Sequence, residues 1–335
     1  METVSTSSQT LQEEASIHEF FNLVATETLA LFDHLEFEFL TEYEVFAPAR
    51  RGRTRDHEPP ELFRGFLHCY YKNVYGTRPV TRELRNDLVW LGCGFDRPPS
   101  RDAVDRFLTD LGHVVEDVFT RLVEQAAVRG LLDMTFRIDS TDVKALPWND
   151  DASWNYDPTA EEFYYGFGCT VVTTGSKIPI AAEFTDAKRA KQETAMRVTC
   201  DALAVKQPIW MLGDGAYDLL DWHDRLLEAG VVPIAPYNPR NTNDPLDIEY
   251  RVEDRIDKYS DDVQLKQSIL DETYDRRSQA ERTIGACADC GLGTLRARGR
   301  VHARTQCYLA LCLRLVVAIT NYERGDNPGS TVITV

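Results

Sequence analysis

Lysine, long apolar runs and a cationic N-terminus are scarce or absent in this 335-residue sequence. Eight lysines stand against 29 arginines, and residues 1–49 contain ten acidic side chains but no lysine or arginine. Such a start lacks the positive segment of a signal peptide. A membrane-spanning helix needs roughly 18 apolar residues, whereas the longest candidate, 308–320, is shorter and contains Arg314. The sequence therefore predicts a cytoplasmic protein without membrane spans.

The cysteines are too dispersed for a disulfide framework. All eight are scattered between Cys69 and Cys312, which favours reduced and mostly buried thiols. Cys287 and Cys290 form a C-x2-C pair, but no second pair of Cys or His ligands follows. A structural zinc site is therefore disfavoured.

The acidic composition indicates both the kind of solvent and the kind of partner that suit this protein. The formal net charge is −17 at pH 7. A lysine-poor, acidic surface favours a protein kept soluble in very high salt, and the alternative is an ordinary acidic cytosolic protein. Because affinity for phosphate backbones comes largely from cationic contacts, the net charge alone argues against a nucleic-acid partner.

The first part of the chain has helical periodicity, and the length suggests about two domains. Apolar residues recur at spacings of three and four, and Pro60, Gly76, Gly92 and Ser100 mark helix ends. The predicted helices are 14–40, 60–76, 81–91, 100–111 and 113–130. The third and fourth could form a helix-turn-helix, in which Arg101 and Arg106 face DNA; the alternative is that both arginines are solvated helix charges.

From Met134 the periodicity changes to that of strands. Met134, Phe136 and Ile138 alternate with polar residues, which predicts a strand that ends at Asp139. The further predicted strands are 163–174, 178–184, 209–212 and 231–235, with a hairpin turn at 174–177. The further predicted helices are 193–205, 217–229, 264–285 and 305–322. This order indicates an α/β domain with a mixed sheet.

Two aspartates follow predicted strands, where sheet domains place their active sites. Asp139 ends the first strand, and Asp214 follows the strand 209–212 between Gly213 and Gly215. Either one alone reads as a cap or turn residue, but the pair favours a site. Asp142 and Asp218 are interpreted as supporting or capping groups, and His223 and His302 as surface residues.

A third group lies on the helix 264–285. Tyr274, Arg277 and Glu281 are spaced i, i+3 and i+7, so they share one helix face. In isolation the last two would be a surface ion pair.

The three groups, taken in order, resemble the DDE transposases of bacterial and archaeal insertion sequences. The matching motifs are Asp139-Ser140-Thr141, Asp214-Gly215-Ala216-Tyr217-Asp218 and Tyr274-x2-Arg277-x3-Glu281. The resemblance implies a helical domain at 1–130 that binds element ends and dimerises, a ribonuclease H-like catalytic domain at 131–325 with a mixed sheet flanked by helices, and a tail at 326–335. Asp139, Asp214 and Glu281 then correspond to the metal-binding catalytic triad. Tyr274 and Arg277 correspond to its helical companions.

The resemblance also implies the chemistry and the partners. Three carboxylates can hold two Mg²⁺ ions about 3.5 to 4 Å apart, with Mn²⁺ as a substitute, and these ions promote cleavage and transfer of phosphodiesters. The expected partners are double-stranded DNA, as terminal inverted repeats and target, and a second copy of the chain in a homodimer.

One departure leaves other functions open. The family often has a lysine seven residues after the glutamate, where this chain has Ala288; Arg282 or Arg296 are candidate replacements. A catalytically silent DNA-binding protein or repressor is therefore one alternative. A hydrolase that uses the same carboxylates on another substrate, such as a glycosidase, is a second, but it leaves the helix of Tyr274 without a role.

A local cationic segment follows the glutamate. Residues 290–322 contain no Asp or Glu, and the candidate DNA contacts within them are Arg296, Arg298, Arg300 and Arg304. A second basic run before the helix 60–76 adds Arg50, Arg51, Arg53 and Arg55. The alternative for both is ordinary solvation of a loop.

Overall fold

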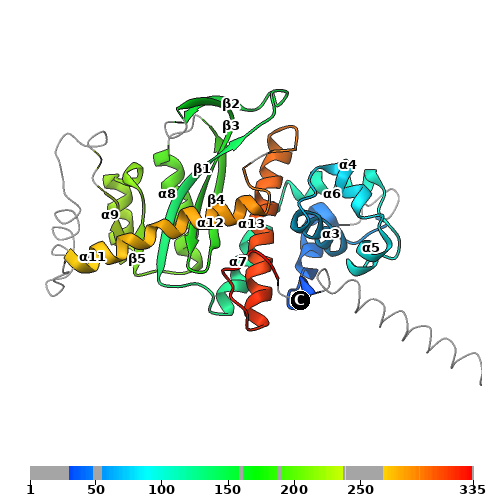
Figure 1. Ribbon diagram of the computed structural model, residues 1–335, viewed down its shortest axis with the longest axis horizontal. Coiled ribbons are helices and arrows are strands. Elements are labelled where there is room, and N and C mark those ends of the chain that lie inside the picture. Colours follow the sequence, from blue (N-terminus) through cyan, green and yellow to red (C-terminus); the bar gives the residue numbers. More distant parts are fainter. Residues whose placement is uncertain are drawn as a thin grey trace, which may run out of the picture.

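The computed structural model describes residues 30–47, 55–157, 161–187, 191–236, 238, 267–293 and 295–333 (Figure 1). Arg50, Arg51 and Arg53, and most of the helix predicted at 14–40, lie outside the described residues.

The N-terminal part is helical, as the sequence predicts. Its elements are the 3₁₀ helices η1 (Glu38–Glu42) and η2 (Glu44–Phe46) and the α-helices α3 (Pro59–Tyr71), α4 (Thr77–Glu83), α5 (Asp87–Gly92), α6 (Arg101–Leu111) and α7 (Val115–Val128). Ser100 caps α6, as expected, by accepting a hydrogen bond from the amide of Ala103 at 3.2 Å.

Three helix predictions in this part are wrong in extent. The predicted helix 14–40 gives way to turns after Ala30 and to η1, because Phe32, Leu35, Phe37 and Leu40 must all be buried. Helix α3 ends at Tyr71 rather than near Gly76, since Asn73 adopts a left-handed conformation (φ 58°). The predicted helix 81–91 is divided between α4 and α5.

A six-stranded mixed sheet forms the second part, which confirms the predicted fold class. Its strands are β1 (Thr135–Lys144), β2 (Ser153–Asp157), β3 (Glu162–Thr174), β4 (Ile178–Asp186), β5 (Trp210–Leu212) and β6 (Val232–Ile234). Strand β3 runs antiparallel to both β4 and β1, and β5 and β6 continue the sheet in parallel with β1. This is the strand arrangement of a ribonuclease H-like sheet, extended by β2 on the far end of β3.

The prediction that the first strand ends at Asp139 is wrong. Strand β1 continues to Lys144 because β3 pairs with it from Arg137 to its last residue, Lys144. Its polar residues are accommodated by neighbouring hydroxyls: Ser140 bonds Thr170, and Asp142 accepts a hydrogen bond from Tyr164 at 2.6 Å. Asp139 is therefore held in the middle of a long strand.

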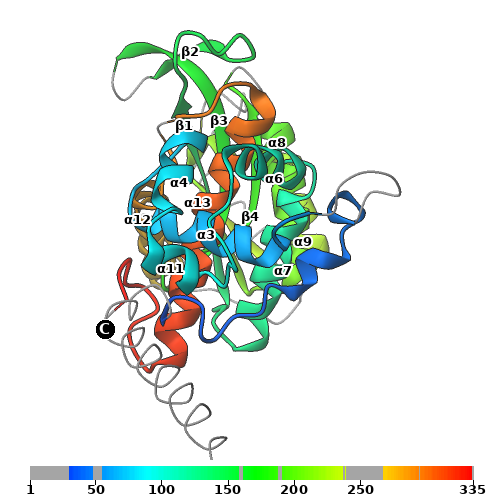
Figure 2. The same ribbon diagram turned by 90° about the vertical axis from the view of Figure 1, so that its right-hand side faces the viewer.

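Helices cover both faces of the sheet. They are α8 (Lys191–Val205), α9 (Leu220–Glu228), α11 (Gln267–Tyr274), α12 (Ser278–Asp289) and α13 (Arg300–Glu323), with the 3₁₀ helices η3 (Gly215–Tyr217) and η4 (Asp275–Arg277). Helix α12 packs against β1 and β3, and α8 packs against β3 and β4. Figure 2 shows these two helices on opposite sides of the strands.

Helix α13 lies between the helical part and the sheet (Figure 1). It packs against α3, α6 and α7 and also against β4 and α12. By length and hydropathy it could cross a membrane, but 94% of its apolar window is buried inside the protein, so it is a core helix. Because this helix joins the two parts in one core, the domain boundary near residue 130 stays a prediction.

Candidate functional site

The register of β1 and β5 brings the two predicted aspartates to neighbouring positions. Arg137 of β1 lies beside Leu212 at the end of β5, and Asp139 and Asp214 each follow two residues later. Because side chains two residues apart on a strand point to the same face, Asp139 shares the face of Arg137. Both aspartates are half-buried.

That face is the one covered by the helix of the third motif. The Nε of Arg137 donates to the carbonyl oxygen of Arg276 in η4 at 2.9 Å. The ring of Tyr274, at the end of α11, packs against Leu212 and Ile234. Asp139 and Asp214 therefore open toward the same segment that carries Glu281.

The loop of Asp214 is fixed to β1 by a tyrosine. The Asp214 carboxylate accepts a hydrogen bond from the amide of Ala216 at 2.8 Å, and Tyr217, at the end of this turn, is fully buried. The Tyr217 hydroxyl hydrogen-bonds the Ser140 hydroxyl at 2.7 Å, directly beside Asp139. Gly213 permits this arrangement, because a Cβ there would lie 2.7 Å from the Cβ of Tyr217.

Two tyrosines experience the negative charge of the site. Burial raises the pKa of Tyr217, and the carboxylates of Asp139 and Asp214 raise it further. Burial also raises the pKa of Tyr274; Arg277 opposes this rise, and Asp214 and Glu281 add to it. The Asp214 carboxylate therefore acts on both tyrosines, together with Asp139 on Tyr217 and with Glu281 on Tyr274.

The third motif lies on one face, as its spacing predicts. The Arg277 guanidinium stands over the ring of Tyr274, 5.9 Å from the centroid, and its Nη2 lies 3.3 Å from Oε1 of Glu281. Glu281 is exposed, in the first turn of α12. In the described part of the chain, no three Asp, Glu, His or Cys side chains stand close enough to hold one metal ion. The Glu281 carboxylate is turned toward Arg277.

The predicted DNA-contacting arginines fall into two groups. Arg101, Arg296 and Arg298 are exposed. Arg300 pairs with Asp186 and lies over the ring of Phe184, and Arg304 lies 3.1 Å from Glu116 of α7. Arg304 also donates to the carbonyl oxygen of Gly112 at 2.6 Å, so it joins α13 to the helical part.

The supporting residues differ in part from the prediction. Asp218 is buried and accepts a hydrogen bond from the amide of Asn238 at 2.9 Å, which fits its predicted supporting role. His223 is not a surface residue, because α9 turns it inward, 3.4 Å from Asp218. Asp142 lies on the face of β1 opposite to Asp139.

Sequence reasoning missed the two contacts that hold the site together. The hydrogen bond between Ser140 and Tyr217 joins residues of the first two motifs, so the hydroxyls beside the two aspartates are the sequence signal for this contact. Arg137 is 1% exposed and joins β1 to η4. An arginine within an alternating strand gives no sign in the sequence of which element it contacts.

Comparison with known proteins decides the family. Residues 132–316 match the family described as the transposase DDE domain. Probable transposases for insertion sequence element ISH11 from two strains of Halobacterium salinarum, a halophile, are each 74% identical over 326 residues, which is 97% of this chain and 99% of theirs. The chain belongs to the DDE transposases of insertion sequences.

Two solved complexes of Mos1 transposase also resemble this transposase weakly. The strand transfer complex is 11% identical, with a TM-score of 0.23 over 78% of this chain and 85% of that one. The paired-end complex with the left transposon end is 10% identical, with a TM-score of 0.21 over 74% and 83%. Likeness at this level carries no argument about the fold.

The donor set of the transposase fits a divalent metal. DDE transposases depend on divalent metal ions, and hard cations prefer carboxylate oxygens, which Asp139 and Asp214 present on one face. Glu281, on the helix α12 that packs against β1, would be the third carboxylate of the set. Cys287 and Cys290 are both buried, and burial raises the pKa of each thiol, which disfavours the thiolates that zinc would need.

Proposed function

We propose that this transposase binds the terminal inverted repeats of an insertion sequence in the cytoplasm and catalyses Mg²⁺-dependent cleavage and transfer of DNA strands. The observation that carries the proposal is the register of β1 and β5, which places Asp139 and Asp214 each two residues beyond the paired residues Arg137 and Leu212, beside the segment of Glu281. Such a site needs no covalent protein nucleophile; water and then a DNA 3′-hydroxyl are the attacking groups.

Each residue of the site has a distinct role in this proposal. Asp139 and Asp214 would hold the metal ions against the rigid sheet, and Glu281, released from Arg277, would supply the third carboxylate. When bound, two Mg²⁺ ions activate the attacking oxygen and stabilise the leaving oxygen of an in-line displacement, and Mn²⁺ substitutes for them. Arg277, released from Glu281, is left with its charge beside the reacting phosphate. Tyr274 holds this helix against β5.

Local arginines hold the DNA although the protein as a whole has a negative net charge. Arg296, Arg298 and Arg101 are exposed and suited to contact phosphates. Arg300 and Arg304 instead hold the segment in place through Asp186 and Glu116. The helical region up to residue 130, with Arg50, Arg51 and Arg53, is proposed to bind the element ends and to form the homodimer.

A catalytically silent DNA-binding protein is the second candidate, favoured by Ala288. This residue is exposed on α12, two turns beyond Glu281, where the family often has lysine. Its neighbour Arg282, also exposed on α12, supplies a cation in the active-enzyme proposal.

Metal-dependent cleavage separates the two candidates. The full-length protein is incubated with a labelled duplex that carries one element end, in Mg²⁺, in Mn²⁺ or in EDTA. The active-enzyme proposal expects strand breaks at the element boundary with either metal and none in EDTA, while a duplex with a scrambled end stays intact. Specific binding of the element end without breaks in either metal would instead establish the silent DNA-binding protein.

A further inference from the structure

Strands β2 and β3 form a two-stranded ribbon that leaves the sheet beyond Gly166. Gly166 pairs with Lys144 at the end of β1 and with Ser153 at the start of β2, and from there β3 pairs with β2. A Cβ on Gly166 would lie 2.2 Å from the carbonyl oxygen of Val143, so only glycine allows the ribbon to pass this closely. The ribbon projects from the sheet at the top of Figure 1.

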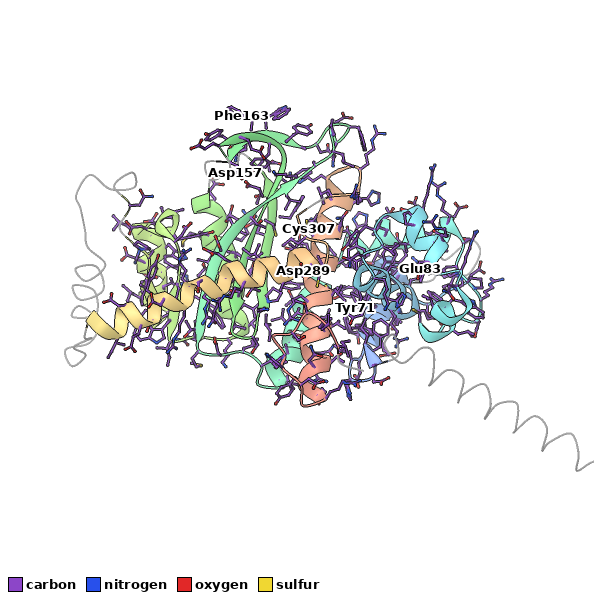
Figure 3. All side chains as sticks on the ribbon, viewed as in Figure 1. Tyr71, Glu83, Asp157, Phe163, Asp289 and Cys307 are labelled. Carbon is purple, nitrogen blue, oxygen red and sulfur yellow. The ribbon has the colours of Figure 1, made fainter. Side chains whose placement is uncertain are left out.

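One face of this ribbon is made of aromatic rings. Trp154 lies opposite Tyr165 and Tyr156 opposite Phe163, with ring centroids 5.3 and 5.1 Å apart. Trp154 is 60% exposed, Tyr156 45% and Phe163 71%; the outward position of Phe163 is visible in Figure 3. These four residues are called the aromatic face. Exposed apolar surface gathered in one patch indicates a binding surface.

The aromatic face continues the face of the sheet that carries Asp139. Asp139 pairs with Val171 of β3, and the pairing of β1 with β3 keeps its register from there to Gly166. Because side chains alternate, Tyr165 and Phe163 point to the same side of β3 as Val171. At about 3.3 Å per residue they lie roughly 20 and 26 Å from the level of Asp139.

The aromatic face also adjoins the cationic segment after α12. The Tyr165 hydroxyl donates to the carbonyl oxygen of Asn149 at 2.8 Å, and the Asn149 side chain accepts a hydrogen bond from the amide of Gly299 at 3.1 Å. The exposed Arg296 and Arg298 stand in the same segment. One chain of contacts therefore links the rings to these arginines.

The distribution of charge on the ribbon indicates which part of a nucleic acid the aromatic face can bind. Asp157 lies opposite Glu162 at its outer end, on the face away from the rings, and Glu162 lies 2.8 Å from Lys144. The four residues of the aromatic face carry no positive charge to attract a phosphate backbone, whereas flat rings bind the faces of bases by stacking, with little regard to their identity. A fully paired duplex hides those faces.

We propose that the aromatic face binds unpaired bases of a DNA strand that leaves the candidate active site, by stacking them on Trp154, Tyr156 and Phe163. This proposal rests on the proposed function, since it assumes DNA at Asp139. The rings hold the bases of a displaced or frayed end, while Arg296 and Arg298 contact its phosphates.

The test measures DNA binding without catalysis. A fluorescently labelled 20-nucleotide single strand and its blunt duplex are titrated with the full-length protein in EDTA, at several KCl concentrations. The variant Trp154→Ala/Tyr156→Ala/Phe163→Ala is expected to bind the single strand at least about tenfold more weakly and the duplex within about twofold of wild type. Tyr322→Ala, which removes an exposed ring near the other end of α13, is the matched control and leaves both affinities unchanged.

Two further measurements distinguish stacking from charge and from misfolding. The triple variant keeps the wild-type slope of log affinity against log salt, whereas Arg298→Ala lowers that slope by about one. Single-stranded DNA quenches tryptophan fluorescence in wild type, and the single variant Trp154→Phe keeps the affinity but loses most of this quenching.

Three results overturn the proposal. One is equal affinity of wild type and triple variant for the single strand, and another is quenching that persists in Trp154→Phe. The third is a change from dimer to monomer in the triple variant with DNA affinity unchanged, which assigns the rings to a second copy of the chain. Failure of the wild-type protein to cleave element ends would contradict the proposed function. It would not change the result of the binding test, which is made in EDTA without catalysis.

Discussion

At the scale of single residues, the site depends on a hydroxyl network behind the two aspartates. Ser140 bonds both Thr170, at 2.8 Å, and Tyr217, at 2.7 Å. Asp139 precedes Ser140, and Tyr217 closes the turn of Asp214, so this network fixes the distance between the two carboxylates. Neither Ser140 nor Tyr217 needs to touch DNA or metal, and both are positioning residues.

Removal of either hydroxyl should destabilise the protein, and to different degrees. Ser140→Ala leaves the hydroxyls of Thr170 and Tyr217 without this hydrogen-bond partner, so the free energy of unfolding should fall by about 1 to 3 kcal/mol. Tyr217→Phe leaves Ser140 bonded to Thr170 and should cost about 1 kcal/mol. Urea unfolding monitored by circular dichroism measures both.

The double variant of these positions provides the control. Because the two changes remove the same contact, Ser140→Ala/Tyr217→Phe should lose less stability than the two single losses combined. Additive losses would show that the two hydroxyls act independently and that the network does not couple the two motifs.

At the scale of elements, a buried arginine joins the sheet to the helix of the third motif. Arg137 donates to the carbonyl oxygen of Thr135 at 2.6 Å in its own strand and to that of Arg276 in η4. Burial lowers the pKa of Arg137, and Asp133, 3.6 Å away, opposes this shift. The arginine therefore remains charged and sets the height of α12 above β1.

The variant Arg137→Met should loosen α12 without removing a metal ligand. Methionine fills much of the space but cannot bond η4, so element-end cleavage is expected to fall by about tenfold or more, while DNA binding is retained. Raising the Mg²⁺ concentration should recover part of the activity, because the ligands are present but poorly placed. Loss of cleavage that no metal concentration relieves, or cleavage at the wild-type rate, would contradict this role.

The same elements show what the sequence can and cannot predict. Alternation after Met134 predicts the strand and the face of Asp139. The length of β1 is decided by its pairing with β3, and the residues of β1 alone do not show how far that pairing extends. The spacing of Arg277 and Glu281 predicts a shared helix face. The direction of the Glu281 carboxylate depends on competition between Arg277 and a metal ion, and no spacing rule decides that.

At the scale of the whole molecule, the acidic surface makes the stability of the folded protein depend on the salt concentration. An open cleft of about 850 Å³ between η1 and α7 gathers several carboxylates. They belong to Asp33, Glu36, Glu38, Glu42 and Glu124. Arg121 and Arg129 line the cleft as well, and Arg121 pairs with Glu42 and Glu124, but the excess of carboxylates opposes folding at low salt. The Debye length falls from about 10 Å at 0.1 M to 3 Å at 1 M.

High salt should therefore stabilise the folded protein. The melting temperature is expected to rise by about 5 °C or more between 0.1 M and 2 M KCl, as measured by differential scanning calorimetry. Asp33→Asn/Glu36→Gln should raise the melting temperature at 0.1 M and reduce its dependence on salt. A melting temperature that is flat or falls with KCl would contradict a salt-adapted surface.

The measurement that tests the account most directly is Mg²⁺-dependent cleavage of an element end by three isosteric variants, with end binding followed in parallel. Asp139→Asn, Asp214→Asn and Glu281→Gln each remove one carboxylate charge, and each should lower the cleavage rate by at least about a hundredfold while the end is still bound. Asp142→Asn, on the opposite face of β1, should cleave at the wild-type rate. Near-wild-type cleavage by any of the three triad variants would contradict the claim that these carboxylates form one metal site.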